Sequence, residues 1–184
     1  MGRADRRPGS LGRLFATHAA IILVPVLLLG AALAMSYRSE ARRRGIAEGR
    51  SEAQLVAQTA IEPFLEDRPL RPGGLTPTER QGLLAIVRRS VVTGSILRLR
   101  IRDLSGHMVF SDDGTGFGEA IGDEPVTAAR GRVVAVLTRL NSDANDTGPR
   151  GPATVEVYLP LSGAPGHRIG VLEIYLPYLS LIHI

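Results

Sequence analysis

Hydrophobic positions are most concentrated in one stretch near the N-terminus, residues 14–35, which contains no Asp, Glu, Lys or Arg. At ~1.5 Å per residue a helix of this length covers ~33 Å, and a bilayer core is ~30 Å thick. A buried helix of a soluble protein is seldom apolar on all sides for so long. The pattern therefore predicts a transmembrane helix over residues 14–35, with the lipid bilayer as a partner.

A cleaved signal peptide is the alternative for this stretch, because arginines precede it and Ala32, Leu33 and Ala34 form an A-x-A cleavage pattern. The chain would then be a secreted binding domain. We favour the anchor, since the apolar run exceeds the usual signal core and the following residues continue the same helix. Four arginines lie on each side of the run, so the positive-inside rule gives no orientation.

A helical pattern continues over residues 36–65, which are rich in Ala, Glu, Arg and Gln. Small and apolar residues recur there at steps of three and four, at Ala53, Ala57, Ala60 and Phe64. Such a seam can pair with its copy or pack on its own domain, and the pattern fits both. We predict a juxtamembrane helix and expect a homodimer through it.

The next helix begins with a capping box, in which Thr76 is the N-cap, Pro77 the first helical residue and Glu79 the third. The apolar spacing beyond it predicts a helix over residues 77–92. Its opening also looks like a LuxR-type helix-turn-helix. The following segment alternates as a strand, however, where a recognition helix would be needed. We therefore expect no nucleic-acid partner.

After Gly94 the hydrophobic period changes to two, which is typical of strands with one buried face. The pattern predicts a hairpin over residues 97–110, a short helix over residues 123–130, and strands over residues 133–140, 154–160 and 168–176. The predicted fold class is α+β: a transmembrane helix, a long juxtamembrane helix, and an antiparallel sheet of about five strands flanked by helices.

Composition narrows the chemistry. The absence of cysteine excludes disulfides and thiolate metal sites, and four scattered histidines assemble neither a zinc site nor a nucleophile–base pair. All 22 basic residues are arginines, and those flanking the apolar stretch suit lipid headgroups better than nucleic acid. With 184 residues, the chain has room for one domain and an anchor. We expect no catalytic site, cofactor or metal.

Charged residues alternate on one face of the predicted sheet, at Arg98, Arg100, Arg102, Glu156 and Glu173. We interpret them as cross-strand ion pairs on a solvated face. The alternative is a pocket in which the arginines grip an anionic ligand. The loop at residues 141–146 has oxygen ligands at alternate positions, but it lacks the glycine and glutamate of a calcium loop, so an Asx-rich surface loop is expected.

The order of these elements resembles the extracytoplasmic Cache/PAS-like sensor region of bacterial transmembrane signalling proteins. The resemblance covers residues 11–178, and its motifs are IRDLSGHMVFSDD, AARG, VEVYLPL and IGVLEIYLPY. GGDEF/EAL cyclic-di-GMP enzymes and sensor histidine kinases of GC-rich bacteria are the nearest examples. The resemblance implies an inner-membrane protein whose sheet helps to bind an unknown small ligand. Strand position makes Arg100, Arg139 and Tyr158 the candidate ligand-binding residues.

The same resemblance implies a cytoplasmic tail at residues 1–13 and an extracytoplasmic sensor domain at residues 66–178. A second membrane helix and an output domain would follow, with a diguanylate cyclase or phosphodiesterase favoured over a histidine kinase, so we interpret the chain as a truncated input module that is not itself an enzyme. Residues 179–184 match the translation of the transposon-end adapter CTGTCTCTTATACACATC and are expected to be non-native.

Overall fold

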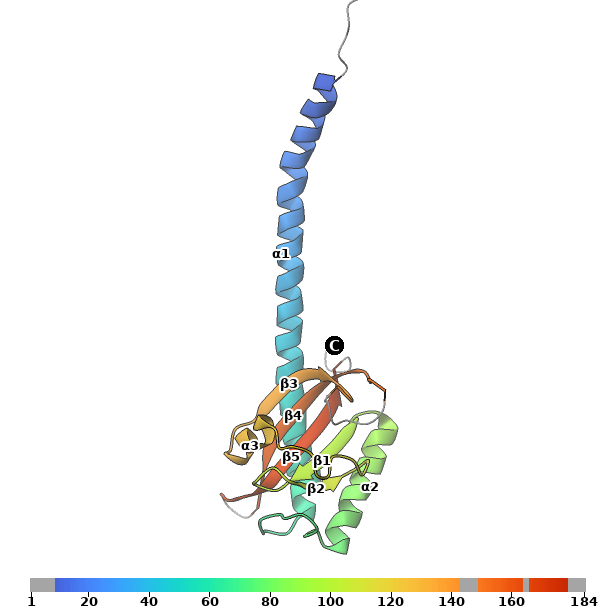
Figure 1. The fold of residues 1–184 in the computed structure, drawn as a ribbon, viewed down its shortest axis with the longest axis vertical. Helices are drawn as coiled ribbons and strands as arrows, with labels where there is room; N and C mark the ends of the chain where they lie inside the picture. The colour runs from blue at the N-terminus through green and yellow to red at the C-terminus, as the bar shows by residue number, and fades with distance from the viewer. Residues whose placement is uncertain (1–8, 143–148, 164–165, 179–184) are drawn as a thin grey trace, which may run out of the picture. The chain divides into compact units, whose positions relative to one another are not determined.

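The computed structural model describes residues 9–142, 149–163 and 166–178. The expected Asx-rich surface loop at residues 141–146 lies partly outside these ranges. The first eight residues of the expected cytoplasmic tail and residues 179–184, which are expected to be non-native, lie outside them as well. Residues 1–41 and 42–184 form two compact units. The elements are α1 (Gly9–Val56), η1 (Ala57–Ile61), η2 (Glu62–Phe64), α2 (Pro77–Thr93), β1 (Arg98–Arg102), β2 (Met108–Ser111), α3 (Asp123–Ala129), β3 (Val134–Arg139), β4 (Ala153–Ser162) and β5 (Arg168–Pro177) (Figure 1).

The N-terminal unit consists of the first part of α1, and the predicted membrane span is helical throughout. Its large apolar side chains are exposed, with Phe15 79% and Leu28 66% accessible. Pro25 lies inside the helix without ending it, as membrane helices tolerate. Among the described residues this is one helix long and apolar enough to cross a bilayer, with a mean hydropathy of 2.5 in its most apolar window.

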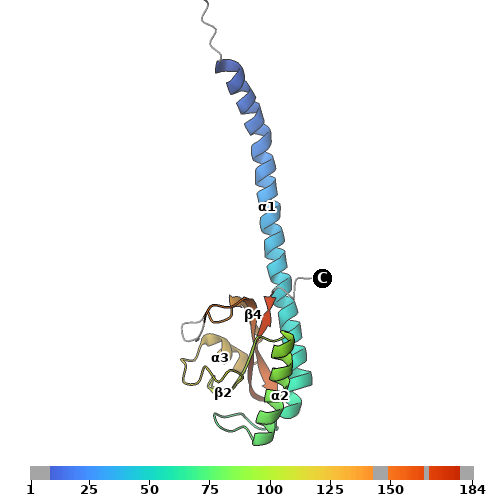
Figure 2. The ribbon, with the colours of Figure 1, turned by 90° about the vertical axis from the view of Figure 1, so that its right-hand side faces the viewer.

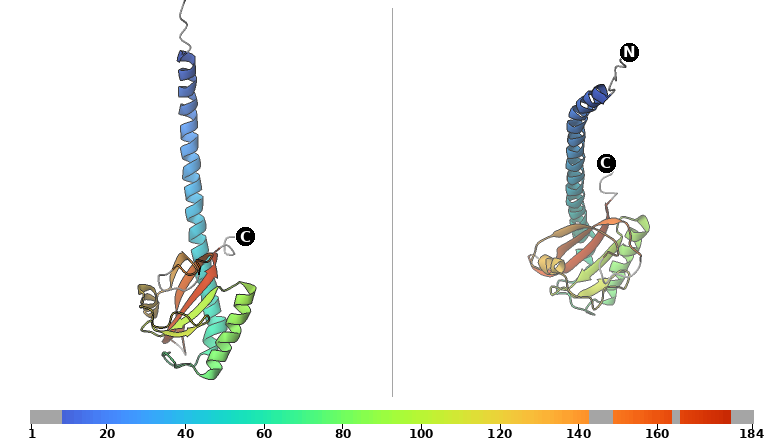
Figure 3. Two further views of the ribbon diagram at one scale, coloured as in Figure 1. Left: turned by 45° about the vertical axis from the view of Figure 1, so that its right-hand side comes forward. Right: turned by 45° about the horizontal axis from the view of Figure 1, so that its top comes forward.

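The second unit is built on one antiparallel sheet with the strand order β2-β1-β5-β4-β3 (Figure 3). The hairpin of β1 and β2 was predicted from the alternating pattern. The strands β4 and β5 were also predicted, and the structure pairs them in a second hairpin. The pairing of β1 with β5 joins residues far apart in sequence and places Arg100 opposite Glu173. Five antiparallel strands with flanking helices confirm the predicted α+β class.

Helices lie on both faces of the sheet (Figure 2). The last turns of α1, together with η1 and α2, cover one face, where the apolar side chains of β1, β4 and β5 form the main core. The short helix α3 lies on the other face and packs Ala128 against Tyr158 and Val171. The sheet thus separates an apolar layer from a layer that is largely polar.

The predicted seam of the juxtamembrane helix packs on its own domain. Ala53 and Ala57 are fully buried in the main core. Leu55 lies on a different side of the same helix and is 61% exposed. Of the two arrangements that the pattern allowed, the structure shows the intramolecular one for these alanines.

The capping box of α2 is present as predicted. Thr76 Oγ1 accepts a hydrogen bond from Glu79 N at 3.2 Å, and Glu79 Oε2 accepts one from Thr76 N at 2.7 Å. The buried Glu79 carboxylate also accepts hydrogen bonds from Arg68 and from the amide of Glu66. Glu79, which was predicted as part of the capping box, therefore also holds the loop before α2 in place.

The juxtamembrane helix changes its hydrogen-bonding pattern before it ends. α1 passes at Val56 into the π-helix η1, and Glu62 N donates to Ala57 O. The 3-10 turn η2 follows, with Pro63 inside it. Because proline has no N–H to donate, it cannot continue the helical ladder, and the chain leaves the helix at Leu65. The sequence pattern indicated a helix here but not the π-turn.

Candidate functional site

The charged face of the sheet is buried, so its interpretation as a solvated face was wrong. Exposed fractions are between 0% and 6% for Arg98, Arg100, Arg102, Glu156 and Glu173. The segment between β2 and β3, including α3, covers this face (Figure 2). Gly116 approaches so closely that an added Cβ would lie 3.2 Å from Arg100 Cζ. The predicted ion pairs exist, but protein rather than water surrounds them.

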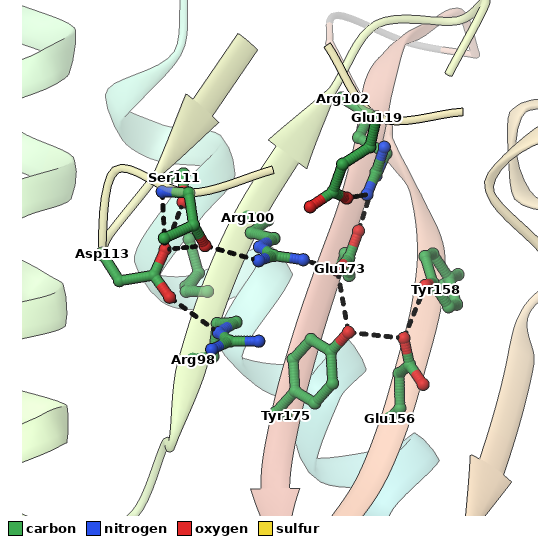
Figure 4. Close-up of polar contacts among 12 residues, drawn as sticks. Arg98, Arg100, Arg102, Ser111, Asp113, Glu119, Glu156, Tyr158, Glu173 and Tyr175 are labelled. Atoms are coloured by element: carbon green, nitrogen blue, oxygen red, sulfur yellow. Dashed lines mark hydrogen bonds and ion pairs between the residues drawn. The ribbon is translucent and has the colours of Figure 1, made fainter. Parts of the chain in front are cut away.

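Strand register brings these side chains together (Figure 4). Alternate residues of a strand share a face, so Arg98, Arg100 and Arg102 all point to the α3 side. Glu173 on β5 lies directly opposite Arg100 on one side and Tyr158 of β4 on the other. Three strands from two different hairpins therefore supply one polar cluster.

Glu173 is the centre of the cluster. Its Oε2 accepts a hydrogen bond from Arg102 Nε at 2.6 Å, and its Oε1 accepts one from Arg100 Nη1 at 3.3 Å. The hydroxyl of Tyr175 lies 3.0 Å from the same Oε1. Arg102 also donates to the carbonyl of Gly106 at 3.1 Å. One fully buried carboxylate thus compensates two guanidinium groups.

The second buried carboxylate, Glu156, accepts hydrogen bonds from two tyrosines. Tyr158 and Tyr175 donate to its Oε1 at 2.5 Å and 2.7 Å. Burial raises the pKa of both tyrosine hydroxyls far above the usual range, and the nearby Glu173 and Glu156 carboxylates raise it further. Both hydroxyls therefore remain hydrogen-bond donors at neutral pH.

Arg98 extends the cluster toward the end of β2. Its Nε lies 3.0 Å from Asp113 Oδ2, and its guanidinium stacks over Tyr175, 5.5 Å from the ring centre. Burial raises the pKa of Asp113, but hydrogen bonds from Thr115 and Ser111 and the Arg98 charge outweigh it and lower the pKa to about 2. Asp113 is therefore ionised across the physiological range.

Acidification is expected to remove the stabilising contribution of Asp113. Because folding lowers its pKa, that contribution is fully present above the ordinary value of 3.8 and is lost as the pH falls toward about 2. The unfolding free energy of the full chain and of Asp113→Asn can be compared by circular dichroism across this range. The difference between the two proteins should shrink as the pH falls, and a constant difference would contradict the assignment.

A cavity of about 220 Å³ lies between the polar cluster and the segment that precedes α3. The charged side chains in its wall are Arg100, Arg102, Glu119, Glu124, Glu156 and Glu173. Tyr158 lines it as well. The cavity therefore combines buried charges from the sheet with carboxylates from the covering segment, an arrangement suited to a small polar ligand.

Two of the three candidate residues from the sequence lie at this cavity. Arg100 and Tyr158 belong to its wall, whereas Arg139 is exposed at the end of β3 and donates to the carbonyl of Gly151. Sequence reasoning did not select the glutamates of the wall. Glu156 and Glu173 could be recognised in the sequence as charged positions of predicted strands. Glu119 and Glu124 belong to a segment whose packing against the sheet could not be predicted from the hydrophobic pattern.

A second cavity of about 230 Å³ lies on the opposite face, between the end of α1 and the edge of the sheet. Gln54, Gln58, Glu62 and Ser162 supply its polar groups, and Leu159 is among its apolar ones. It contains a single ionisable side chain. The described residues contain no group of three His, Asp or Glu side chains placed to hold a metal ion. We therefore take the cavity over the polar cluster as the candidate site.

Comparison with known proteins gives matches among solved structures. No protein-family model matches the chain, and no curated protein matches its sequence. The sensor domain of Escherichia coli DcuS is 16% identical, with 78% of this chain and 93% of that chain covered and a TM-score of 0.43.

The ligand-binding domain of the Pseudomonas fluorescens chemoreceptor CtaA, solved in complex with L-serine, is 14% identical with a TM-score of 0.43. Its complex with L-alanine is 15% identical with a TM-score of 0.44. In both comparisons 79% of this chain is covered, and the match spans 60% of the CtaA domain. These solved structures are bacterial sensor and ligand-binding domains.

Proposed function

We propose that the chain is the input module of a bacterial membrane signalling protein. The domain binds a small ligand outside the membrane in the cavity over the polar cluster, and α1 relays the event to an output domain in the cytoplasm. The cavity with its buried charges is the observation that carries this proposal. Buried ion pairs often contribute no more stability than apolar residues of the same volume, so a binding role accounts better for so many charges on one face.

A route from the cavity to the helix supports the relay. β4 and β5 supply Glu156, Tyr158 and Glu173 to the site, and the hairpin that they form contacts the segment that follows the long helix, in η2 and in the loop after it. Ser162 N donates to Glu62 Oε1 at 2.8 Å, and His167 lies 2.9 Å from Asp67. A ligand can shift the helix only if it binds two arrangements of these strands with different affinities.

The parent protein in this proposal is a diguanylate cyclase or phosphodiesterase, with a histidine kinase as the alternative. The apolar first part of α1 anchors it in the inner membrane. Two copies would pair through the juxtamembrane helix. Since Ala53 and Ala57 are buried within the domain, the exposed side of the helix that carries Leu55 would form that contact.

Ligand binding at the cavity is tested by thermal unfolding of the full chain in detergent with a panel of small amines, carboxylates, amino acids and sugars. A ligand present at 100 times its Kd stabilises the folded state by about 2.7 kcal/mol, and at least one class should raise the Tm. Tyr158→Phe at the cavity should reduce this rise, while the exposed Tyr37→Phe should not. A panel without effect, or a rise that cavity substitutions leave unchanged, would contradict the proposal.

A further inference from the structure

The wall of the candidate cavity is unequally charged. It contains the carboxylates of Glu119, Glu124, Glu156 and Glu173 but only the guanidinium groups of Arg100 and Arg102. The other arginines near this face lie elsewhere: Arg98 pairs with Asp113 outside the wall, and Arg168 is exposed near Gly131. Four negative groups face two positive ones, so the wall carries a formal charge of about −2.

Both arginines of the wall already have protein partners. Arg100 contacts Glu173 and donates to Thr115 Oγ1 at 2.7 Å. Arg102 contacts Glu173 and Gly106, and its Nη2 lies 3.9 Å from Glu119. An anionic ligand that reached these guanidinium groups would also face the carboxylates of Glu119, Glu124 and Glu156. The guanidinium groups therefore organise the floor of the cavity rather than attract an anion.

A positively charged ligand would be attracted by the carboxylates of the wall. Interactions between charges are several times stronger in a partly desolvated cavity than in water, so the excess of carboxylates favours a positive ligand and repels a negative one. A protonated amine offers up to three N–H donors, and carboxylates accept several hydrogen bonds each. Hydrogen bonds between charged partners are about twice as strong as neutral ones.

The size of the cavity limits the ligand. Its volume of about 220 Å³ is several times the space that one water molecule needs, so the cavity can hold a small organic molecule. The wall thus combines an excess of negative charge with room for a compact molecule.

We infer that the ligand of this cavity is a small organic cation that carries a protonated amine. This inference rests on the proposed ligand-binding function and specifies the ligand class. Glu156 and Glu124, from the sheet and from α3, hold the ammonium group between them, while Glu173 keeps the arginines in place. This inference is the opposite of the alternative drawn from the sequence, an arginine pocket for an anion.

Isothermal titration calorimetry tests the inference on the full chain in an uncharged detergent. Butylamine, butyramide and butyrate have similar shapes and differ in charge, and putrescine and succinate add a second charge of either sign. The amines should bind, and the neutral and anionic probes should bind at least tenfold more weakly. Binding by butyrate or succinate alone would overturn the cation inference while leaving the proposed binding function intact.

Two variants locate the binding. Glu156→Gln removes the charge but keeps an oxygen that can accept hydrogen bonds from the two tyrosine hydroxyls. Glu124→Gln removes the charge of the carboxylate on α3. Each should weaken amine binding by about 30-fold, whereas the exposed Glu48→Gln on α1 should leave it unchanged. Circular dichroism establishes that the variants fold. Amine affinities that both cavity variants retain would overturn the inference, and an absence of binding by every probe would overturn the proposed function with it.

Discussion

Replacing Glu173 with glutamine is expected to destabilise the protein by about 3–5 kcal/mol, because it leaves two buried guanidinium groups without their shared counter-charge. Glutamine has nearly the same shape, so the loss measures charge rather than packing. Arg100 and Arg102 are 2% and 6% exposed, and water cannot replace the missing carboxylate.

The measurement is urea or thermal unfolding of the full chain in detergent, followed by circular dichroism. A loss of this size corresponds to a fall in Tm of about 10 °C or more for a domain of this length. Glu48→Gln on the exposed surface of α1 is the matched control and should change stability by less than about 0.5 kcal/mol. A destabilisation below about 1 kcal/mol for Glu173→Gln would show that the arginines find other compensation.

Alkaline pH is expected to destabilise the protein through Tyr158 and Tyr175. Burial raises the pKa of both hydroxyls in the folded protein, so they lose their protons at a lower pH in the unfolded chain than in the folded one. Their contribution to stability is complete below the ordinary value of 10 and is lost as the pH rises above it. Two such groups together remove about 2–3 kcal/mol between pH 9 and pH 11.

The amino-acid composition allows the alkaline pH dependence to be assigned to tyrosines. The chain has neither lysine nor cysteine, so tyrosines are the only side chains that ordinarily titrate between the range of histidine and that of arginine. Tyr175→Phe should halve the loss of unfolding free energy between pH 9 and pH 11. The absorbance of the Tyr175 tyrosinate, measured as the difference between the wild type and this variant, should appear only when the protein unfolds. Ionisation of both tyrosines in the folded protein near pH 10 would contradict the burial argument.

Features that depend on neighbouring residues could be predicted from the sequence. The capping box at Thr76 gave the start of α2, and the alternation beyond Gly94 gave the first hairpin and the strands after it, since each depends on local geometry alone. The exposure of the charged strand face could not be predicted. A strand with alternating arginines has the same pattern whether water or another segment lies over it, and here residues 112–125 provide the cover.

The candidate site shows the same limit. Arg100 and Tyr158 were chosen for their strand positions and line the cavity. Arg139 was chosen on the same grounds and lies at the exposed end of an edge strand. Strand position decides which face a side chain occupies, but the pairing order decides which residues meet. Only the pairing of β1 with β5, which bridges most of the domain, places Glu173 between two arginines.

The π-turn η1 has a geometric consequence for the long helix. A π-turn closes its hydrogen bonds one residue later than an α-turn, so Ala57–Ile61 holds one residue more than an α-helix would. One residue of an α-helix corresponds to ~100° of rotation and 1.5 Å of rise. Conversion of η1 into α-helix would therefore turn residues 42–56 about their axis by roughly that angle relative to the sheet. The side of residues 42–56 that packs on the sheet is therefore set by the five residues of η1.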